Sequence, residues 1–206
     1  MSYLPHLLTL IGVWVVVTIT PGPDFAVTIR YATARSRRDG VFVALGVATG
    51  LTIWITGSMA GLGVLFAHFS WLVEIIRTLG ALYLTYLGIK MILIAHRQPL
   101  EFAAGVVPTR RFSAWRIGFL SNLSNPKLAA FFSSLFAALL PANLPFWVQG
   151  TMVLVMLAVT TVWLCIVACF SSLGPIVRFY RRAKRWIDYI TGGLFVALGV
   201  RLAVER

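Results

Sequence analysis

Charged residues are scarce in this chain of 206 residues. Only 12% of the residues are charged, while 59% are hydrophobic, and this charged share is about half of what a soluble domain usually carries. The apolar residues form blocks of about 20 or more, long enough to cross a hydrocarbon core roughly 30 Å thick. No long polar segment remains between them. This excludes a soluble domain and a membrane anchor with a separate catalytic head, and it predicts a single integral membrane domain over residues 1–206.

Reactive side chains are equally sparse. The histidines, His6, His68 and His96, are scattered along the chain, so we expect no metal site. The two cysteines, Cys165 and Cys169, stand four residues apart in one apolar block, which is typical of small packing residues. The sequence contains no HExxH, CxxC, nucleophile elbow or phosphate-binding glycine loop. We therefore expect neither enzymatic activity nor a cofactor.

Acidic residues are outnumbered by basic ones, and the formal net charge is +12. Most of the Lys and Arg residues lie in or beside three links, which join the first apolar block to the second, the third to the fourth and the fifth to the sixth. This alternation follows the positive-inside rule, so the basic residues indicate membrane topology rather than a nucleic-acid partner. The three basic links are predicted to be cytoplasmic and both termini periplasmic.

Six membrane spans are expected, at about 4–29, 41–66, 71–95, 114–140, 146–173 and 187–204. A basic loop, 178–185, is expected before the last span. Three spans in each half give the halves opposite orientations, and the sequence holds weak traces of such a repeat. Leu87–Lys90 resembles Leu198–Arg201 at a shift of 111 residues, and Pro126 follows Pro23 by 103 residues. We predict an all-α membrane protein built as a 3+3 inverted repeat, with halves at about 1–95 and 114–206 joined by a cytoplasmic loop, 96–113.

The second span carries glycines at the spacing that lets membrane helices approach closely. Gly46 and Gly50 form one such pair, and Gly57 and Gly61 form another. We expect both pairs to serve helix packing.

The first span is interrupted by Thr20-Pro21-Gly22-Pro23-Asp24. Because proline cannot donate a backbone hydrogen bond, the helix must kink or break here. Irregular backbone at membrane depth is tolerated only inside protein or beside a polar cavity. Asp24 is the only acidic residue well inside a predicted span, where a charge is costly. It could bind a substrate amino group or carry a proton, or it could simply cap the broken helix.

The fourth span holds a second interruption, around Asn125 and Pro126, which is followed by Lys127. In transporters with inverted repeats, interrupted helices in corresponding positions hold the substrate. Lys127 suits a carboxylate as Asp24 suits an ammonium group, so the two breaks together describe a site for a zwitterion. A structural Asp24–Lys127 ion pair that locks the two halves is the alternative. The predicted substrate-binding residues are Thr20, Pro21, Gly22, Pro23, Asp24, Asn122, Asn125, Pro126 and Lys127.

Three segments, Thr20–Asp24, Gly80–Gly88 and Gly118–Lys127, resemble the LysE/RhtB family of bacterial amino-acid exporters, and the resemblance extends over nearly the whole chain. It implies a multi-pass protein of the inner membrane that exports amino acids such as homoserine, threonine, lysine or arginine by alternating access, coupled to protons. Many members of that family have Asn where this chain has Asp24. A homodimer is left open.

Other functions remain possible at this point. Export of a metal cation would need several thiol, imidazole or carboxylate ligands near the membrane midplane, and only Asp24 qualifies. Thiol-based electron transfer across the membrane would need a cysteine near each break. A scaffold that transports nothing would show no change in thermal stability with any ligand.

Overall fold

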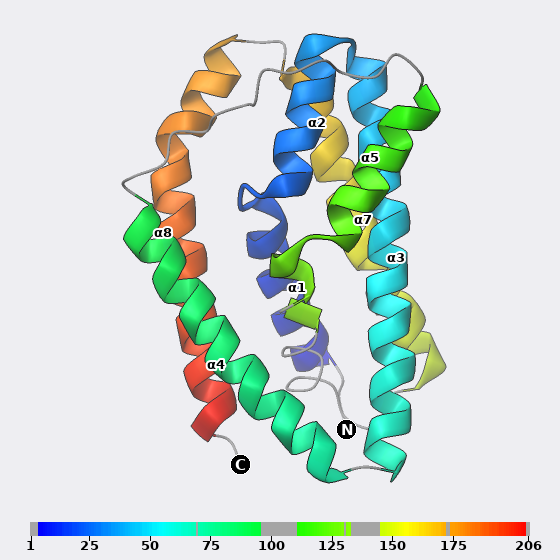
Figure 1. Ribbon diagram of the computed structural model, residues 1–206, viewed down its shortest axis with the longest axis vertical. Coiled ribbons are helices and arrows are strands. Elements are labelled where there is room, and N and C mark those ends of the chain that lie inside the picture. Colours follow the sequence, from blue (N-terminus) through cyan, green and yellow to red (C-terminus); the bar gives the residue numbers. More distant parts are fainter. Residues whose placement is uncertain are drawn as a thin grey trace.

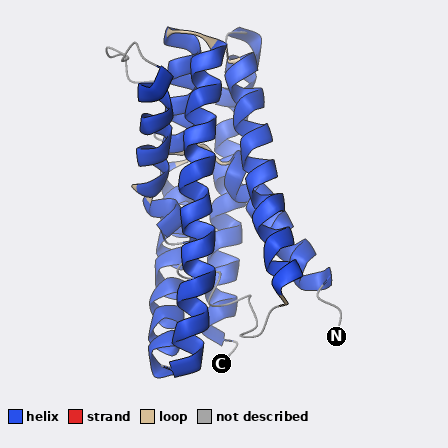
Figure 2. Cartoon of the chain, turned by 90° about the vertical axis from the view of Figure 1, so that its right-hand side faces the viewer, coloured by secondary structure: helices blue, strands red, loops and turns tan. Residues whose placement is uncertain are grey.

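The computed structural model describes residues 4–68, 70–95, 111–129, 131–132, 145–171 and 174–204. The regular structure of these residues is helical throughout, which confirms the all-α prediction (Figure 2). The helices are α1 (Leu4–Ile19), α2 (Pro23–Ala34), α3 (Arg37–His68), α4 (Ser70–Ile94), α5 (Arg111–Leu123), α7 (Phe146–Phe170) and α8 (Gly174–Val204). A further helical segment begins at Pro126, after α5.

Several of these helices can cross a membrane. α3, α4, α7 and α8 each contain a sufficiently long apolar stretch, and α1 with α2 adds a fifth span if the pair is counted as one. The axes of α1 and α2 differ by 49° across the break between them. The fourth expected span is described only as far as residue 132, and residues 96–110 of the expected cytoplasmic loop lie outside the described residues. The chain is therefore a multi-pass membrane protein, and its sixth span stays a prediction.

The start of α8 corrects one expected boundary. The helix begins at Gly174, so the basic stretch 178–185 is helical and not a loop. Lys and Arg are good helix formers, and a helix can continue beyond the hydrocarbon region without losing any of its backbone hydrogen bonds. Charge therefore marks where the membrane ends, but it does not mark where the helix ends.

The helices form two groups around the broken pair. α4 packs along α8, and α3 packs along α5 and α7. The α1–α2 pair lies between the groups in Figure 1, where α2 contacts α3, α5 and α7. α1 begins and α8 ends at the same, lower end of the molecule (Figure 1). This arrangement places the break at mid-height, surrounded by the other helices.

Close contact between α3 and α5 depends on glycine. A Cβ atom at Gly46 would lie 2.0 Å from the carbonyl oxygen of Trp115, and one at Gly118 would lie 2.1 Å from that of Val43. The packing role predicted for Gly46 is confirmed. It is wrong for Gly57 as far as the described residues go, since none of them would lie within 4 Å of a Cβ atom there.

α4 and α8 also meet at glycines. A Cβ atom at Gly88 would lie 2.5 Å from the carbonyl oxygen of Gly192, and one at Gly199 would lie 2.7 Å from that of Ala81. Backbones this close are typical of membrane helices that pack through small residues. The two contacts hold α4 and α8 together as one unit.

An aromatic core lies beside the break. The ring of Trp14 packs against those of Phe131 and Phe132, with centroids 5.1 Å and 5.6 Å apart. The Trp14 Nε1 donates to the Met156 carbonyl and to Thr160 Oγ1, each at 3.1 Å. These contacts join α1 to α7 and to the segment that follows the second break, so the helix that leads into the first break is held from both sides.

Candidate functional site

Lys127 completes the end of α1. A helix leaves its last carbonyl groups without backbone donors, and here Pro21 and Pro23 remove two donors that could have served them. The Lys127 Nζ donates to the Val17 carbonyl at 2.7 Å and to the Thr20 carbonyl at 3.3 Å. A cation at the carboxyl end of a helix also interacts favourably with the helix dipole. Lys127, from the second break, therefore stabilises the first.

Other side chains contact two further carbonyl groups at this helix end. The hydroxyl of Thr20 lies 2.7 Å from the Val16 carbonyl and 2.5 Å from the hydroxyl of Thr191 on α8. The Tyr180 hydroxyl, also from α8, donates to the Ile19 carbonyl at 2.6 Å. The break is thus held by α8 as well as by the second break.

Asp24 lies in the first turn of α2, directly after Pro23. Its carboxylate accepts hydrogen bonds from Ser121 Oγ at 3.0 Å, Asn122 Nδ2 at 3.0 Å and Asn125 Nδ2 at 3.1 Å. A carboxylate at the amino end of a helix is favoured by the dipole, but Asp24 does not cap α2: the N-cap residue is Gly22, and no side chain makes a cap hydrogen bond there. A carboxylate offers about four acceptor positions, and three of them are occupied here.

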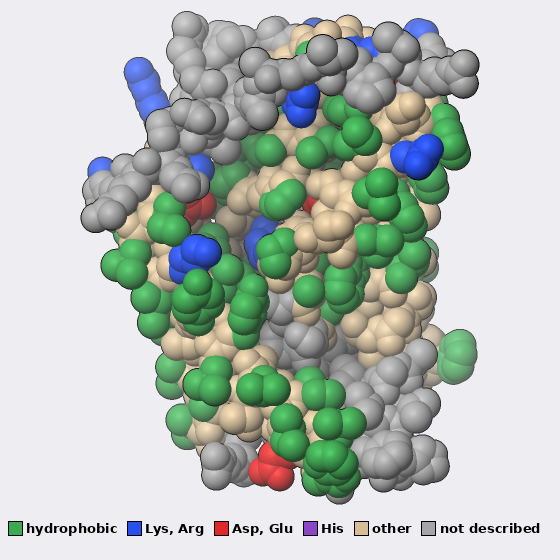
Figure 3. All heavy atoms as spheres, in the orientation of Figure 1, with side chains coloured by type: hydrophobic (Ala, Val, Ile, Leu, Met, Phe, Trp, Pro, Cys, Tyr) green, Lys and Arg blue, Asp and Glu red, His purple; other side chains and the backbone are tan. Residues whose placement is uncertain are grey.

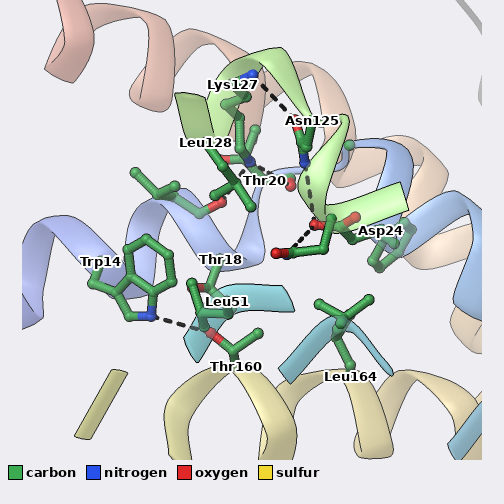
Figure 4. Close-up of a pocket in the computed structure, with 15 residues that line it drawn as sticks. Trp14, Thr18, Thr20, Asp24, Leu51, Asn125, Lys127, Leu128, Thr160 and Leu164 are labelled. Carbon is green, nitrogen blue, oxygen red and sulfur yellow. Dashed lines mark hydrogen bonds between the residues drawn. The ribbon is translucent and has the colours of Figure 1, made fainter. Parts of the chain in front are cut away.

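Asn125 connects the two breaks (Figure 4). Its Oδ1 accepts from the Lys127 backbone N–H at 3.1 Å, as an N-cap residue does at the start of a helix. Its Nδ2 donates to Asp24. One amide therefore fixes the helix that begins at Pro126 and the carboxylate of α2 in the same place.

Asn122 is almost fully buried, with 1% of its surface exposed. The Trp54 Nε1 donates to its carbonyl at 3.2 Å, and Gly50 provides its space, because a Cβ atom there would lie 2.8 Å from Asn122 Oδ1. That Oδ1 atom and the Thr18 hydroxyl oxygen are buried without a hydrogen-bond partner among the described residues. Buried polar atoms are nearly always paired, so these two oxygens are acceptors that the described residues leave unused.

The Asp24–Lys127 ion pair is not formed. The structure records no ion pair within 4.0 Å between these two described side chains, whereas Arg35–Asp39 and Lys184–Asp188 do pair, at 3.8 Å and 2.6 Å. Asp24 and Lys127 are each held by neutral groups of the opposite break. The two charges therefore lie in one site without neutralising each other directly.

Two cavities adjoin the breaks. The smaller, of about 40 Å³, reaches Asp24, Asn122 and Thr18, and at roughly 10–15 Å³ for each water it has room for a few water molecules. The larger, of about 390 Å³, lies between α2, α4 and α8. Lys127, Gly22 and Asn125 line both cavities and so form the partition between them.

All the substrate-binding residues predicted from the sequence lie around the two breaks, and each lines at least one of the two cavities. The smaller cavity takes Thr20, Gly22, Asp24, Asn122, Asn125 and Lys127, and the larger takes Pro21, Gly22, Pro23, Asn125, Pro126 and Lys127.

The sequence analysis missed Ser121, Tyr180 and Thr191. Ser121 directly precedes Asn122, and its place in the second interruption could have drawn attention to it. Tyr180 and Thr191 lie far from both breaks in sequence and carry no local signal. Only the packing of α8 brings them to the break.

The described part of the chain shows few groups suited to metal export or to thiol-based electron transfer. No three His, Cys, Asp or Glu side chains within it come together as a metal-binding group. Cys165 and Cys169 both lie on α7 and line neither cavity.

Comparison with known proteins gives consistent matches. The model of a family described as LysE type translocator matches residues 15–206. A threonine efflux protein of Escherichia coli K12 is 29% identical over 201 residues, which cover 97% of this chain and 98% of the relative. A threonine efflux protein of Salmonella typhi is 30% identical over 202 residues, covering 96% and 97%. An uncharacterized membrane protein of Haemophilus influenzae is 31% identical over 196 residues, covering 94% and 93%. No solved structure matches the chain.

Proposed function

The chain belongs to the family of LysE type translocators, and from this we propose that it exports amino acids across the bacterial inner membrane through the site formed by its two helix breaks. Relatives of nearly equal length are named threonine efflux proteins. Threonine and the closely similar homoserine are therefore the first candidates, ahead of the basic amino acids lysine and arginine.

One observation carries the substrate-binding proposal: among the described residues, each charged group of the site has one hydrogen-bonding position without a partner. The ammonium group of lysine has three donors, and Lys127 uses two of them on Val17 and Thr20. The carboxylate of Asp24 uses three of about four acceptor positions. One donor is thus left for a substrate carboxylate and one acceptor for a substrate ammonium group.

The neighbours of Asp24 favour the same assignment. Asn122 and Thr18 line the same small cavity as Asp24, and each has an oxygen without a hydrogen-bond partner among the described residues. Three oxygen acceptors around one space suit an ammonium group, whose three N–H donors need three partners. We assign the amino group of the substrate to this cavity.

We also propose that the protein is a six-span, 3+3 inverted repeat. A shift of 111 residues relates Gly88 to Gly199 and Ala81 to Gly192. The close contact between Gly88 and Gly192 therefore has a counterpart between Gly199 and Ala81, and both contacts are present. The 103-residue shift converts Asp24 into Lys127, and each of these reaches the break of the opposite half. A pseudo-two-fold axis through the site accounts for both relations and supports alternating access about it.

The proposed orientation places the basic links in the cytoplasm and both termini in the periplasm. On the face shown in Figure 3, the Lys and Arg side chains gather in the upper half of the molecule, towards the α2–α3 link. This distribution is expected if the upper end is cytoplasmic. We further propose that protons drive export, with Asp24 as the group that exchanges them.

Efflux from proteoliposomes tests the function. Vesicles containing the purified protein would be loaded with labelled threonine, homoserine, lysine or arginine, and wild type would be compared with Lys127→Met. Loss of a hydrogen bond to a charged donor costs about 1.5–3 kcal/mol, so we expect at least a tenfold loss of efflux for the accepted substrate. Arg116→Met, which removes an exposed cation that lines neither cavity, is the control.

Size-exclusion chromatography and thermal unfolding in detergent would show that the Lys127 variant is folded. Normal efflux by folded Lys127→Met would refute the site. Failure of the wild type to move any of the four amino acids would refute the proposed function.

A further inference from the structure

The larger cavity has an unusual set of charges. The chain contains only three lysines, Lys90, Lys127 and Lys184, and all three line this cavity. Asp188 is its acidic lining residue among those described, and it already pairs with Lys184 at 2.6 Å. Two lysine charges therefore remain without an acidic partner in the cavity wall. Such a cavity attracts an anionic group.

The larger cavity lies within one half of the molecule. From the break it extends along α2, past Lys90 and Ile94 near the end of α4, and to Lys184 in the first half of α8. These parts lie towards the end of the molecule that carries the basic links. Figure 3 shows a hollow on this side, between the α4–α8 pair and the other helices, with a basic side chain inside it.

The two cavities differ about tenfold in volume, at about 390 and 40 Å³. The smaller one, which Asp24 lines, has room for a few water molecules or an ammonium group but not for a whole amino acid. The larger one can hold a small solute. Lys127 stands between them and touches both, so a solute in the larger cavity meets Lys127 before it can reach Asp24.

Lys90 lies at the exposed part of this path. Its side chain is exposed, and its Nζ lies 5.8 Å from the centroid of the Tyr86 ring. This contact holds the cation over an aromatic face and occupies none of its three N–H donors through a conventional hydrogen bond, so within the described part of the chain these donors can serve an anion.

We propose that the larger cavity is a loading site, in which Lys90 attracts the carboxylate of a cytoplasmic amino acid and passes it to Lys127. This inference rests on the proposed function and adds a second subsite to it. The substrate carboxylate binds first to Lys90 and then to Lys127. The amino group enters the smaller cavity only after Lys127 has bound the carboxylate. Lys90 accordingly governs capture of the substrate and not its passage through the break.

Charge replacement at position 90 tests the proposal. In a background with Cys165→Ala and Cys169→Ala, we would introduce Lys90→Cys and measure threonine efflux against internal concentration at low ionic strength. Because an exposed charge contributes only modestly, the half-saturating threonine concentration should rise about two- to fivefold at an unchanged maximal rate. Arg116→Cys is the matched control, because Arg116 is an exposed cation over the Phe112 ring, at 6.0 Å, outside the cavity.

Chemical modification separates charge from structure. A methanethiosulfonate reagent that adds an ethylammonium group should restore the half-saturating concentration of Lys90→Cys, and one that adds an ethylsulfonate group should raise it further. Threonine amide, which lacks the carboxylate, should compete equally well in the background and in Lys90→Cys. If the cysteine-free background is inactive, Lys90→Met in the natural chain gives the same comparison without the reagents.

An unchanged half-saturating concentration in Lys90→Cys, or equal effects of the two reagents, would overturn the loading site while leaving the proposed function standing. Absence of efflux by the wild type would overturn the proposed function itself.

Discussion

Asp24→Asn isolates the charge of the first break from its geometry. In the wild type, Oδ2 accepts from Asn122 and Asn125, and Oδ1 accepts from Ser121. The amide oxygen can take the place of Oδ2 and keep both donors. The amide nitrogen can take the place of Oδ1 and donate to the Ser121 oxygen, whose hydroxyl rotates freely. The substitution therefore preserves every hydrogen bond and loses mainly the interaction with the α2 dipole, about 0.3–1 kcal/mol.

The expected effect on transport is larger than the effect on stability. A hydrogen bond to a charged group contributes about 1.5–3 kcal/mol, against about 0.5–1.5 kcal/mol for a neutral one. Replacing the carboxylate that we propose as the partner of the substrate ammonium group should cost about 1–1.5 kcal/mol. Since 1.4 kcal/mol corresponds to a factor of ten, the half-saturating concentration of threonine should rise roughly tenfold.

Efflux from proteoliposomes at several internal threonine concentrations measures this change. The same vesicles test the proposed proton coupling when a pH gradient is imposed. We expect the gradient to accelerate the wild type and not the variant, because an amide cannot exchange a proton. Glu74→Gln, an equal change at an exposed position near the start of α4, is the control. A folded Asp24→Asn protein with unaltered half-saturating concentration and unaltered response to the gradient would refute the role of Asp24 in binding and in coupling.

Two further predictions concern stability. Tyr180→Phe keeps the ring stacked on Phe25, whose ring centroid lies 4.4 Å away, but removes the donor to the Ile19 carbonyl. The free energy of unfolding in detergent should therefore fall by about 1–3 kcal/mol. An unchanged thermal midpoint would show that the break does not depend on this hydrogen bond. Gly46→Leu should prevent recovery of a monodisperse protein on size-exclusion chromatography, because its Cβ would lie 2.0 Å from the Trp115 carbonyl, whereas Gly57→Leu faces open space and should be tolerated. Equal recovery of the two glycine variants would contradict the α3–α5 packing.

Much of the site was predictable because proline and charge act locally. Pro21 and Pro23 cannot donate backbone hydrogen bonds wherever they stand, so the position of the break follows from the sequence. A charge inside an apolar run is costly in any membrane protein, and this singled out Asp24 and Lys127 before any contact was known. The structure brings both into one site.

The partners of these residues could not be predicted in the same way. From sequence, an ion pair between Asp24 and Lys127 was as reasonable as separate roles. The structure separates them because the carbonyl groups freed by the first break take up the Lys127 ammonium, and the amides of the second break take up the Asp24 carboxylate. Which donor reaches which acceptor depends on how far one helix is shifted along another.

The sequence by itself determined that this is a helical membrane protein with two polar interruptions of opposite charge, because hydropathy and backbone chemistry are properties of the chain. Only the tertiary structure decided that α8 supplies Tyr180 and Thr191 to the first break, and that every lysine faces one cavity. Those relations join residues far apart in the chain. They arise from close packing at glycines such as Gly88 and Gly192, where the approach of two backbones sets the position of every side chain between them.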